Sequence, residues 1–313
     1  MSQVMTRPHP VRTARVGLAL ALVSGMSFGL SGALAKALLA AGWSPLAAVF
    51  ARLAGAAIVL AVPAGWLLRG RWRPNRKSAT VLVLYGAIAV AGCQVCFFNA
   101  VRYLPVGVAL LIEYLAPVLI VGWTWWRTRT RPSGSVAAGV LLALLGLVFV
   151  LNLTGPVAVN LVGVAWALVA ALCLGFYFVL ASRQDDGLPP LMMAAGGTAV
   201  GAVGVAAIGV TGLLPITFTA RDTAIGTIHT SWWVPLVLLI LIATVLAYVT
   251  GIEAVRRLGP KLASFTALTE VLFAVLAAWL LLGEAPRLPQ LIGGACIIAG
   301  IVVIRRDELS RSS

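Results

Sequence analysis

The sequence predicts an all-α polytopic membrane protein, with ten transmembrane helices arranged as two inverted five-helix repeats. Three features support this prediction: the composition, the spacing of the apolar runs and a weak internal repeat. Of the 313 residues, 61% are hydrophobic and only 10% are charged, whereas a soluble domain carries about 25% charged residues. Apolar runs of about 20 residues, the length that spans a bilayer, recur along the whole chain. We therefore expect the lipid bilayer to be the main surrounding of this protein.

Ten apolar runs are long enough to be membrane spans, and glycine or proline separates most of them. The first run follows a basic N-terminal segment and is longer than the apolar core of a signal peptide, so we expect it to be retained as a helix. The predicted spans are 16–41, 45–68, 79–100, 105–126, 134–152, 159–182, 189–214, 231–254, 260–282 and 288–304.

The basic residues predict the orientation of these spans. A net charge of +14 would suggest nucleic-acid binding in a soluble chain. Here 18 of the 23 Lys and Arg residues lie in alternate connections or at the two ends, which the positive-inside rule explains without a nucleic-acid partner. Both termini are therefore expected in the cytoplasm. The 18 residues are Arg7, Arg12, Arg15, Arg69, Arg71, Arg73, Arg76, Lys77, Arg127, Arg129, Arg131, Arg183, Arg256, Arg257, Lys261, Arg305, Arg306 and Arg311.

A weak internal repeat divides the spans into two halves. At an offset of 154 residues, AVRYL (100–104) aligns with AVRRL (254–258), Gly139 with Gly293 and Gly146 with Gly300. Each half has five spans, and an odd number makes the second half enter the membrane from the opposite side. Inverted repeats of this kind are typical of secondary transporters, which bind substrate near the midplane between the halves. The predicted units are a cytoplasmic segment 1–15, a first repeat 16–152, a connection 153–158, a second repeat 159–304 and a cytoplasmic tail 305–313.

Four ionisable residues lie deep within predicted spans: Lys36, Arg52, Glu113 and Glu270. A charged side chain at this depth costs roughly 2.5–3.5 kcal/mol on insertion scales, so it normally faces the interior of the bundle or a cavity. For the two glutamates we expect either binding of a substrate ammonium group or coupling to a proton. The alternative is a structural role, as partners of Arg52, Lys36 or a polar side chain.

The two basic residues leave more readings open. Arg52 is a candidate to bind a substrate carboxylate, which together with Glu113 would suit a zwitterion, or to form a structural ion pair with Glu113. Lys36 lies near the outer end of its span and is able to reach the interface with its long side chain. For Glu253 we expect a local ion pair with Arg256 or Arg257, and for Glu284 a role in capping a helix or anchoring a loop.

Further polar residues and one proline are candidates for the same region. Gln94, Asn99 and Tyr114 are candidate cavity groups, or hydrogen-bond partners between helices. Pro117 lacks the amide that would bond to the carbonyl of Glu113, so we expect the helix to be distorted where this carboxylate lies. An irregular backbone inside a membrane is tolerated only beside protein or cavity water.

Several motifs are missing from the sequence. The two histidines lie outside the predicted spans, and no nucleotide-binding loop is present, so we expect no metal site, no cofactor and no ATP-driven transport. The cysteines Cys93, Cys96, Cys173 and Cys296 all lie in apolar runs and are interpreted as buried packing residues. We find no catalytic cluster and do not expect an enzyme.

The residues of both halves resemble a known family. The stretch 268–304, with Leu281-Leu282-Gly283-Glu284 and a glycine-rich last span, resembles the EamA-type transporters of the drug/metabolite transporter superfamily. Glu270 matches an acidic position of that family, although Val271 stands where the family usually has proline. The stretch VRYLPVGVALLIEYLAPVL (101–119) is similar to the threonine/homoserine exporter-like branch. The resemblance implies movement of small metabolites, often amino acids, across the bacterial inner membrane, usually outward.

These observations predict an inner-membrane secondary transporter that exports a small amino-acid-like metabolite by alternating access. A broad exporter of drugs or organic metabolites is the main alternative, and a non-transporting scaffold or membrane enzyme is a third. The substrate, the choice between a proton as coupling ion and uniport, and the choice between monomer and homodimer stay open.

Overall fold

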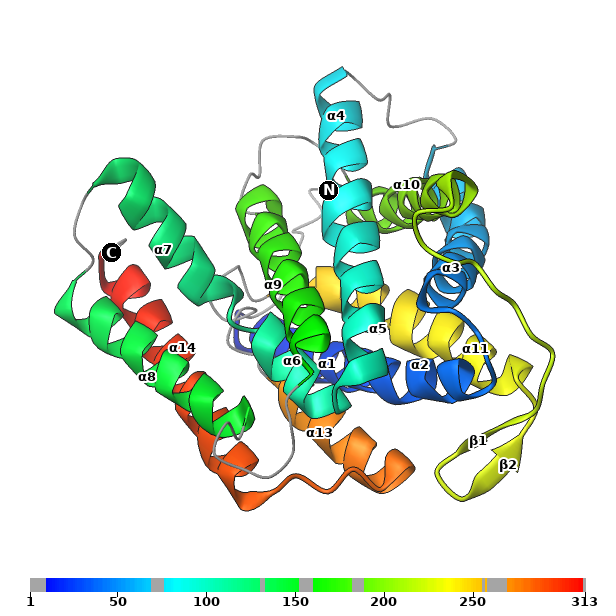
Figure 1. Ribbon diagram of the computed structural model, residues 1–313. Coiled ribbons are helices and arrows are strands. Elements are labelled where there is room, and N and C mark those ends of the chain that lie inside the picture. The colour runs from blue at the N-terminus through cyan, green and yellow to red at the C-terminus, as the bar shows by residue number, and fades with distance from the viewer. Residues whose placement is uncertain are drawn as a thin grey trace, which may run out of the picture.

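The protein is almost entirely helical (Figure 1). The computed structural model describes residues 10–68, 76–129, 133–151, 160–181, 189–254, 257 and 269–311. The helices of the first half are α1 (Pro10–Gly29), α2 (Ser31–Ala40), α3 (Pro45–Leu68), α4 (Arg76–Leu84), η1 (Tyr85–Gly92), α5 (Cys93–Tyr103), α6 (Val106–Glu113), α7 (Ala116–Thr128) and α8 (Gly134–Leu151). The later elements are α9 (Leu161–Ala181), α10 (Pro190–Thr211), β1 (Thr223–Ile225), β2 (Ile228–Thr230), α11 (Trp233–Ile240), η3 (Leu241–Leu246), α13 (Thr269–Leu282) and α14 (Leu288–Arg311).

Five helical stretches are long and apolar enough to cross a membrane by length and composition: 15–40, 45–66, 78–103, 191–211 and 233–254. Four more apolar helices are shorter, at 134–149, 161–176, 269–282 and 288–304. The predicted span 105–126 is interrupted, because α6 ends at Glu113 and α7 begins at Ala116. The first part of the predicted span 260–282, and the predicted connection 153–158, lie outside the described residues. The count of ten spans therefore stays a prediction.

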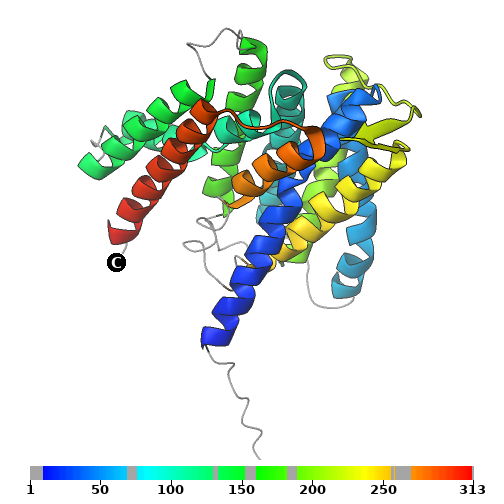
Figure 2. The same ribbon diagram turned by 90° about the horizontal axis from the view of Figure 1, so that it is seen from below.

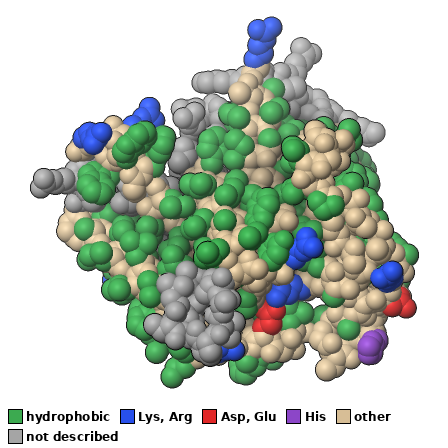
Figure 3. Space-filling model, viewed as in Figure 1, with side chains coloured by type: hydrophobic (Ala, Val, Ile, Leu, Met, Phe, Trp, Pro, Cys, Tyr) green, Lys and Arg blue, Asp and Glu red, His purple; other side chains and the backbone are tan. Residues whose placement is uncertain are grey.

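Apolar side chains cover much of the protein surface, as Figure 3 shows for one face. Val210 is 90% exposed, Leu280 70% and Val62 66%. Large exposed apolar patches are unusual on a soluble monomer, but they are what a surface in contact with lipid tails requires. The protein is a polytopic membrane protein.

The helices α8 and α14 cross at glycines, and the contacts of these glycines indicate a two-fold relation between the halves. A Cβ on Gly139 would lie 2.7 Å from the carbonyl oxygen of Gly300, and one on Gly146 would lie 2.5 Å from that of Gly293. The offset of 154 residues pairs Gly139 with Gly293 and Gly146 with Gly300. Exchanging the two halves therefore turns one contact into the other. The two helices run antiparallel and lie side by side in both views (Figures 1 and 2).

Two π-helical segments, one in each half, lie at positions related by the same offset. The segment η1 covers 85–92 and η3 covers 241–246, and the offset of 154 residues carries 85–92 onto 239–246. A π-helix interrupts the regular hydrogen-bond ladder of an α-helix and is often found at functional sites. Both halves thus have a π-helical distortion at corresponding positions.

A small hairpin covers one end of the bundle. The strands β1 and β2 pair antiparallel, with Ala224 opposite His229. Thr223 Oγ1 donates to the carbonyl oxygen of Ala37 at 2.6 Å, which ties the hairpin to the end of α2. Gly226 has a φ of +64°, and a Cβ there would lie 2.3 Å from the carbonyl oxygen of Leu281, so only glycine allows the turn to approach α13 this closely. The sequence predicts no regular element in this connection.

The glycine crossing of α8 and α14 gives a stability prediction. In the variant Gly300→Ala, the new Cβ would lie 2.5 Å from the Gly139 carbonyl oxygen and 2.8 Å from the Ala143 amide nitrogen, both of which are backbone atoms. We expect the forced separation of the helices to cost about 1–3 kcal/mol, seen as a lower melting temperature of the purified protein in detergent. Gly204→Ala is the matched control, because nothing lies within 4 Å of that position. Equal melting temperatures of the two variants would contradict this packing.

Candidate functional site

A break between α6 and α7 places Glu113 in the interior of the protein. α6 ends at Glu113, residues 114 and 115 form a turn, and α7 begins at Ala116. Pro117, in the first turn of α7, has no amide hydrogen to continue the hydrogen-bond ladder back to Glu113. The Glu113 side chain is only 7% exposed, and its Oε1 accepts a hydrogen bond from Cys93 Sγ at 3.0 Å.

The same break brings a second, partly buried acid into contact. Tyr114, the residue after Glu113, donates its hydroxyl to Glu270 Oε2 at 3.0 Å. Glu270 lies in the first turn of α13. The turn between α6 and α7 therefore carries one carboxylate and contacts the other.

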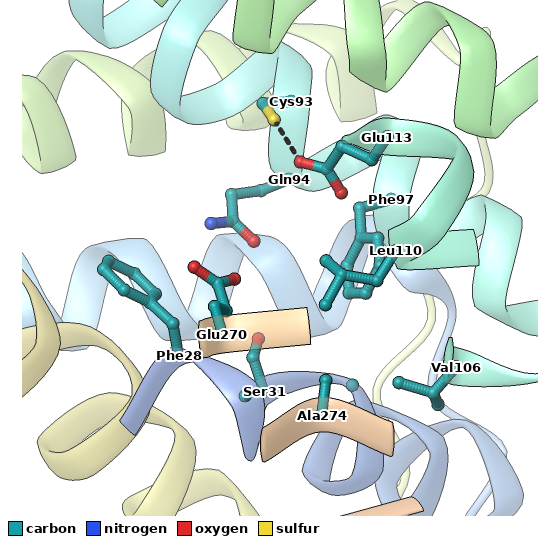
Figure 4. Close-up of a pocket in the computed structure, with 12 residues that line it drawn as sticks. Phe28, Ser31, Cys93, Gln94, Phe97, Val106, Leu110, Glu113, Glu270 and Ala274 are labelled. Carbon is teal, nitrogen blue, oxygen red and sulfur yellow. Dashed lines mark hydrogen bonds between the residues drawn. The ribbon is translucent and has the colours of Figure 1, made fainter. Parts of the chain in front are cut away.

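Glu113 and Glu270 line one small cavity, together with Gln94 (Figure 4). Its volume is about 40 Å³, space for about three waters. In the close-up, the Gln94 amide lies between the two carboxylates. The lining residues come from α1, α2, α5, α6 and α13: Phe28, Gly29, Ser31, Gly32, Cys93, Gln94, Phe97, Val106, Leu110, Glu113, Glu270 and Ala274.

Arg52 contacts two residues of this cavity, is fully buried and makes four hydrogen bonds. Its Nε donates to Thr244 Oγ1 at 2.6 Å, and its Nη2 donates to the carbonyl oxygen of Ala243 at 2.6 Å. Its Nη1 donates to Ser31 Oγ at 2.6 Å and to Gln94 Oε1 at 2.8 Å. The guanidinium carbon also lies 5.7 Å from the centre of the Phe98 ring. One side chain thus joins α2, α3, α5 and η3.

Of the two roles considered for Arg52, the ion pair with Glu113 is not formed in this structure. Within the part of the chain that the structure describes, ion pairs join Lys36 to Glu284 and Arg257 to Glu253, and Arg52 has none. Neutral oxygens satisfy its guanidinium instead. The predicted local ion pair of Glu253 is confirmed, with 2.8 Å between Oε1 and Arg257 Nε.

Lys36 and Asn99 do not line the cavity. Lys36 pairs with Glu284, whose Oε2 also accepts a hydrogen bond from the Val106 amide at 3.0 Å. Glu284 therefore anchors the loop after α13 to the start of α6, as expected for a capping or anchoring residue. Asn99 donates from Nδ2 to the Val95 carbonyl oxygen at 2.8 Å, a bond within its own helix.

Sequence reasoning missed three residues of the site. Cys93 was interpreted as a packing residue, but its thiol contacts Glu113. Ser31 and Thr244 bind Arg52, and no local pattern distinguishes them from other small polar residues in membrane helices. One feature of the sequence could have indicated Cys93: it stands next to Gln94, a candidate cavity residue.

Comparison with known proteins identifies the family. The profile of the EamA-like transporter family matches residues 15–152 and again 161–306. The chain is therefore a membrane transporter of the EamA-like family, within the drug/metabolite transporter superfamily, and contains two copies of the family's domain. Members of this family are transporters rather than enzymes. α6, with Glu113, belongs to the first copy, and α13, with Glu270, to the second.

Three relatives are similar over most of their length. An uncharacterized inner membrane transporter, YicL, from Salmonella typhimurium is 24% identical, over 76% of this chain and 77% of the relative. A probable terminal-alkyne amino-acid exporter from Streptantibioticus cattleyicolor is 29% identical, over 83% of this chain and 84% of the relative. The threonine/homoserine exporter RhtA from Escherichia coli K12 is 26% identical, over 90% of this chain and 88% of the relative.

A solved crystal structure has the same fold. It matches with a TM-score of 0.60 and 22% identity, and the match covers 94% of this chain and 98% of that one.

The Arg52 contacts give a second stability prediction. Thr244→Val removes the oxygen that accepts from Arg52 Nε, and it leaves a buried charged donor without that partner. We expect destabilisation of about 1–3 kcal/mol, measured as a lower melting temperature in detergent. Thr250→Val is the matched control, because the Thr250 hydroxyl donates to the Leu246 carbonyl oxygen within its own helix. A control variant as unstable as Thr244→Val would show that the Arg52 contact contributes nothing specific.

Proposed function

We propose that this protein is an inner-membrane secondary transporter that exports a small amino-acid-like metabolite by alternating access. The observation that carries the proposal is the pair of carboxylates at the cavity. Glu113 comes from the first family domain and Glu270 from the second, and both line the space between them. Among the described residues, neither has an ion-pair partner. A buried acid without a counter-charge is expensive, so a cationic ligand would be favoured between them.

The ammonium group of an amino acid suits this pair of acids. It is a compact cation with three hydrogen-bond donors, and the two carboxylates offer only acceptors when ionised. Two of the three relatives described above are named as exporters of amino acids: threonine and homoserine in one case, terminal-alkyne amino acids in the other. These names support amino acids as the substrate class and export as the direction.

The proposed topology has ten transmembrane helices in two inverted five-helix repeats. The reciprocal glycine contacts between α8 and α14 support a two-fold relation of the halves. The distribution of Lys and Arg supports a cytoplasmic location for both termini. With this topology, the end of α13 and the hairpin of β1 and β2 lie on the outer side of the membrane.

Alternating access requires the cavity to open, because 40 Å³ is too small for an amino acid. Glu284 is placed to hold the outer side closed. Its carboxylate joins Lys36 on α2 to the first amide of α6, while α2, α6 and α13 all contribute cavity residues. Separating these elements at the outer side would break the contacts of Glu284. A proton that replaces the substrate ammonium at Glu113 or Glu270 would provide coupling to an ion gradient.

The carboxylates give the main functional prediction. Glu113→Gln and Glu270→Gln keep the side-chain shape but lose the charge, and we expect each to lower amino-acid flux at least tenfold, since a hydrogen bond to a charged group contributes about 1.5–3 kcal/mol. The measurement compares metabolites in cells and medium for wild-type and variant proteins at equal membrane levels. Glu253→Gln is the control, because that residue makes an ion pair at the surface.

Each outcome of this comparison has a meaning. A metabolite that leaves the cells only with wild-type protein identifies the substrate and direction. Export of chemically unrelated toxins by wild-type protein, without export of amino acids, would favour the broad drug exporter. Unchanged flux in both cavity variants would overturn the proposed site.

The outer closure gives a separate prediction. Glu284→Gln removes the ion pair with Lys36. The side chains of Lys36 and Glu284 are 24% and 23% exposed, so we expect the closed outer side to lose ~0.5–1 kcal/mol of stability. This corresponds to about a two- to fivefold faster reaction of Cys93 with a membrane-impermeant thiol reagent added outside spheroplasts. Peptide mass spectrometry follows the labelling, with Glu253→Gln as control. A labelling rate equal to that of the wild type would exclude Glu284 as an outer closure.

A further inference from the structure

The hydrogen bonds of Arg52 fix the direction in which two cavity residues can donate. A guanidinium group has donors only, so the group that meets it must be an acceptor. Gln94 therefore presents its oxygen to Arg52 Nη1, at 2.8 Å. The NH₂ end of the same amide is left to point away from Arg52, with two hydrogens to donate.

Ser31 is oriented by the same reasoning. Its oxygen accepts from Arg52 Nη1 at 2.6 Å, so the hydroxyl hydrogen points away from the guanidinium and is left to donate elsewhere. Ser31 and Gln94 both line the cavity of Glu113 and Glu270 (Figure 4). Two side chains that have hydrogens left to donate therefore line the cavity beside the two acids.

Arg52 itself does not reach this space. It is fully buried, it is not among the cavity-lining residues, and its Nε and Nη2 are bound to η3 through Thr244 and Ala243. The Thr244 hydroxyl in turn donates to the Leu239 carbonyl oxygen at 2.7 Å, which fixes its lone pairs toward Arg52. Direct binding of a substrate carboxylate by Arg52 would require these contacts to break.

We propose that Arg52 is a positioning residue, which holds Gln94 and Ser31 as hydrogen-bond donors to the carboxylate of the substrate. The site then recognises a zwitterion in two parts: the ammonium group binds at Glu113 and Glu270, and the carboxylate binds at the Gln94 amide and the Ser31 hydroxyl. Arg52 acts only through these two side chains. This assignment rests on the proposed function and adds the feature that distinguishes an amino acid from a simple amine.

The test compares an amino acid with the amine that lacks its carboxylate. The amino acid is the one that wild-type protein in liposomes moves fastest, from a panel of the twenty proteinogenic amino acids and homoserine. The amine is its decarboxylated form. Gln94→Leu removes the amide donors, and we expect it to lower kcat/KM for the amino acid at least tenfold relative to the amine, as for other hydrogen bonds to a charged group.

Two further variants separate positioning from folding. Gln94→Glu keeps the shape and the acceptor for Arg52 but has no NH₂ group, so we expect the same loss of preference for the amino acid in a protein that folds normally. Arg52→Lys keeps the charge but loses the planar fork that orients both partners, and the preference should fall in the same direction. Asn99→Leu is the matched control on α5, because the Asn99 amide binds within its own helix.

The outcomes distinguish the two proposals. If wild-type protein moves no amino acid of the panel, both the proposed function and this assignment fail. If wild-type protein moves an amino acid and the Gln94 and Arg52 variants keep the wild-type ratio of amino acid to amine, the proposed function stands and this assignment falls. An equal fall in the ratio of amino acid to amine in the control Asn99→Leu would also overturn the assignment.

Discussion

The buried guanidinium of Arg52 is the constraint on which the centre of this protein depends. A charge in the interior of a membrane protein must have its donors satisfied, because no water replaces them there. Arg52 meets this requirement with neutral oxygens from α2, α5 and η3, rather than with a carboxylate. Since the positive charge is satisfied without Glu113 or Glu270, the two acids keep their acceptors for a ligand. The same bonds join the two family domains beside the cavity.

The break between α6 and α7 explains how two acids from different halves come together. An uninterrupted helix would carry Glu113 and Tyr114 on different faces, about 100° apart. Ending α6 at Glu113 allows this residue to meet Cys93 and allows Tyr114 to meet Glu270. The offset of 154 residues places Ala267 opposite Glu113, so the second half has no equivalent acid there. The halves are related in packing, as Gly139 and Gly146 show, but not in chemistry.

Much of this organisation could be predicted from the sequence. Apolar runs located the helices closely, for example α3 at 45–68. The charges of Glu113 and Glu270 within such runs indicated the candidate site, because a membrane makes such residues costly. The partners could not be predicted in the same way. Ser31, Cys93 and Thr244 are common small residues in membrane helices, and only the arrangement of helices decides what they contact. The pairing of Arg52 with Glu113, one of the two alternatives for Arg52, does not form, because depth along a helix axis does not define which way a side chain faces.

The central claim is that the substrate binds between Glu113 and Glu270, and the Cys93 thiol beside Glu113 offers a direct test. The measurement is the rate of Cys93 alkylation by N-ethylmaleimide in purified wild-type protein, followed by peptide mass spectrometry, with and without a saturating amount of a transported amino acid. Cys296 on α14, which is partly exposed and does not line the cavity, is the internal control. The account predicts that the amino acid slows alkylation of Cys93 and leaves Cys296 unchanged. Transport of an amino acid that leaves the Cys93 rate unaltered would contradict it.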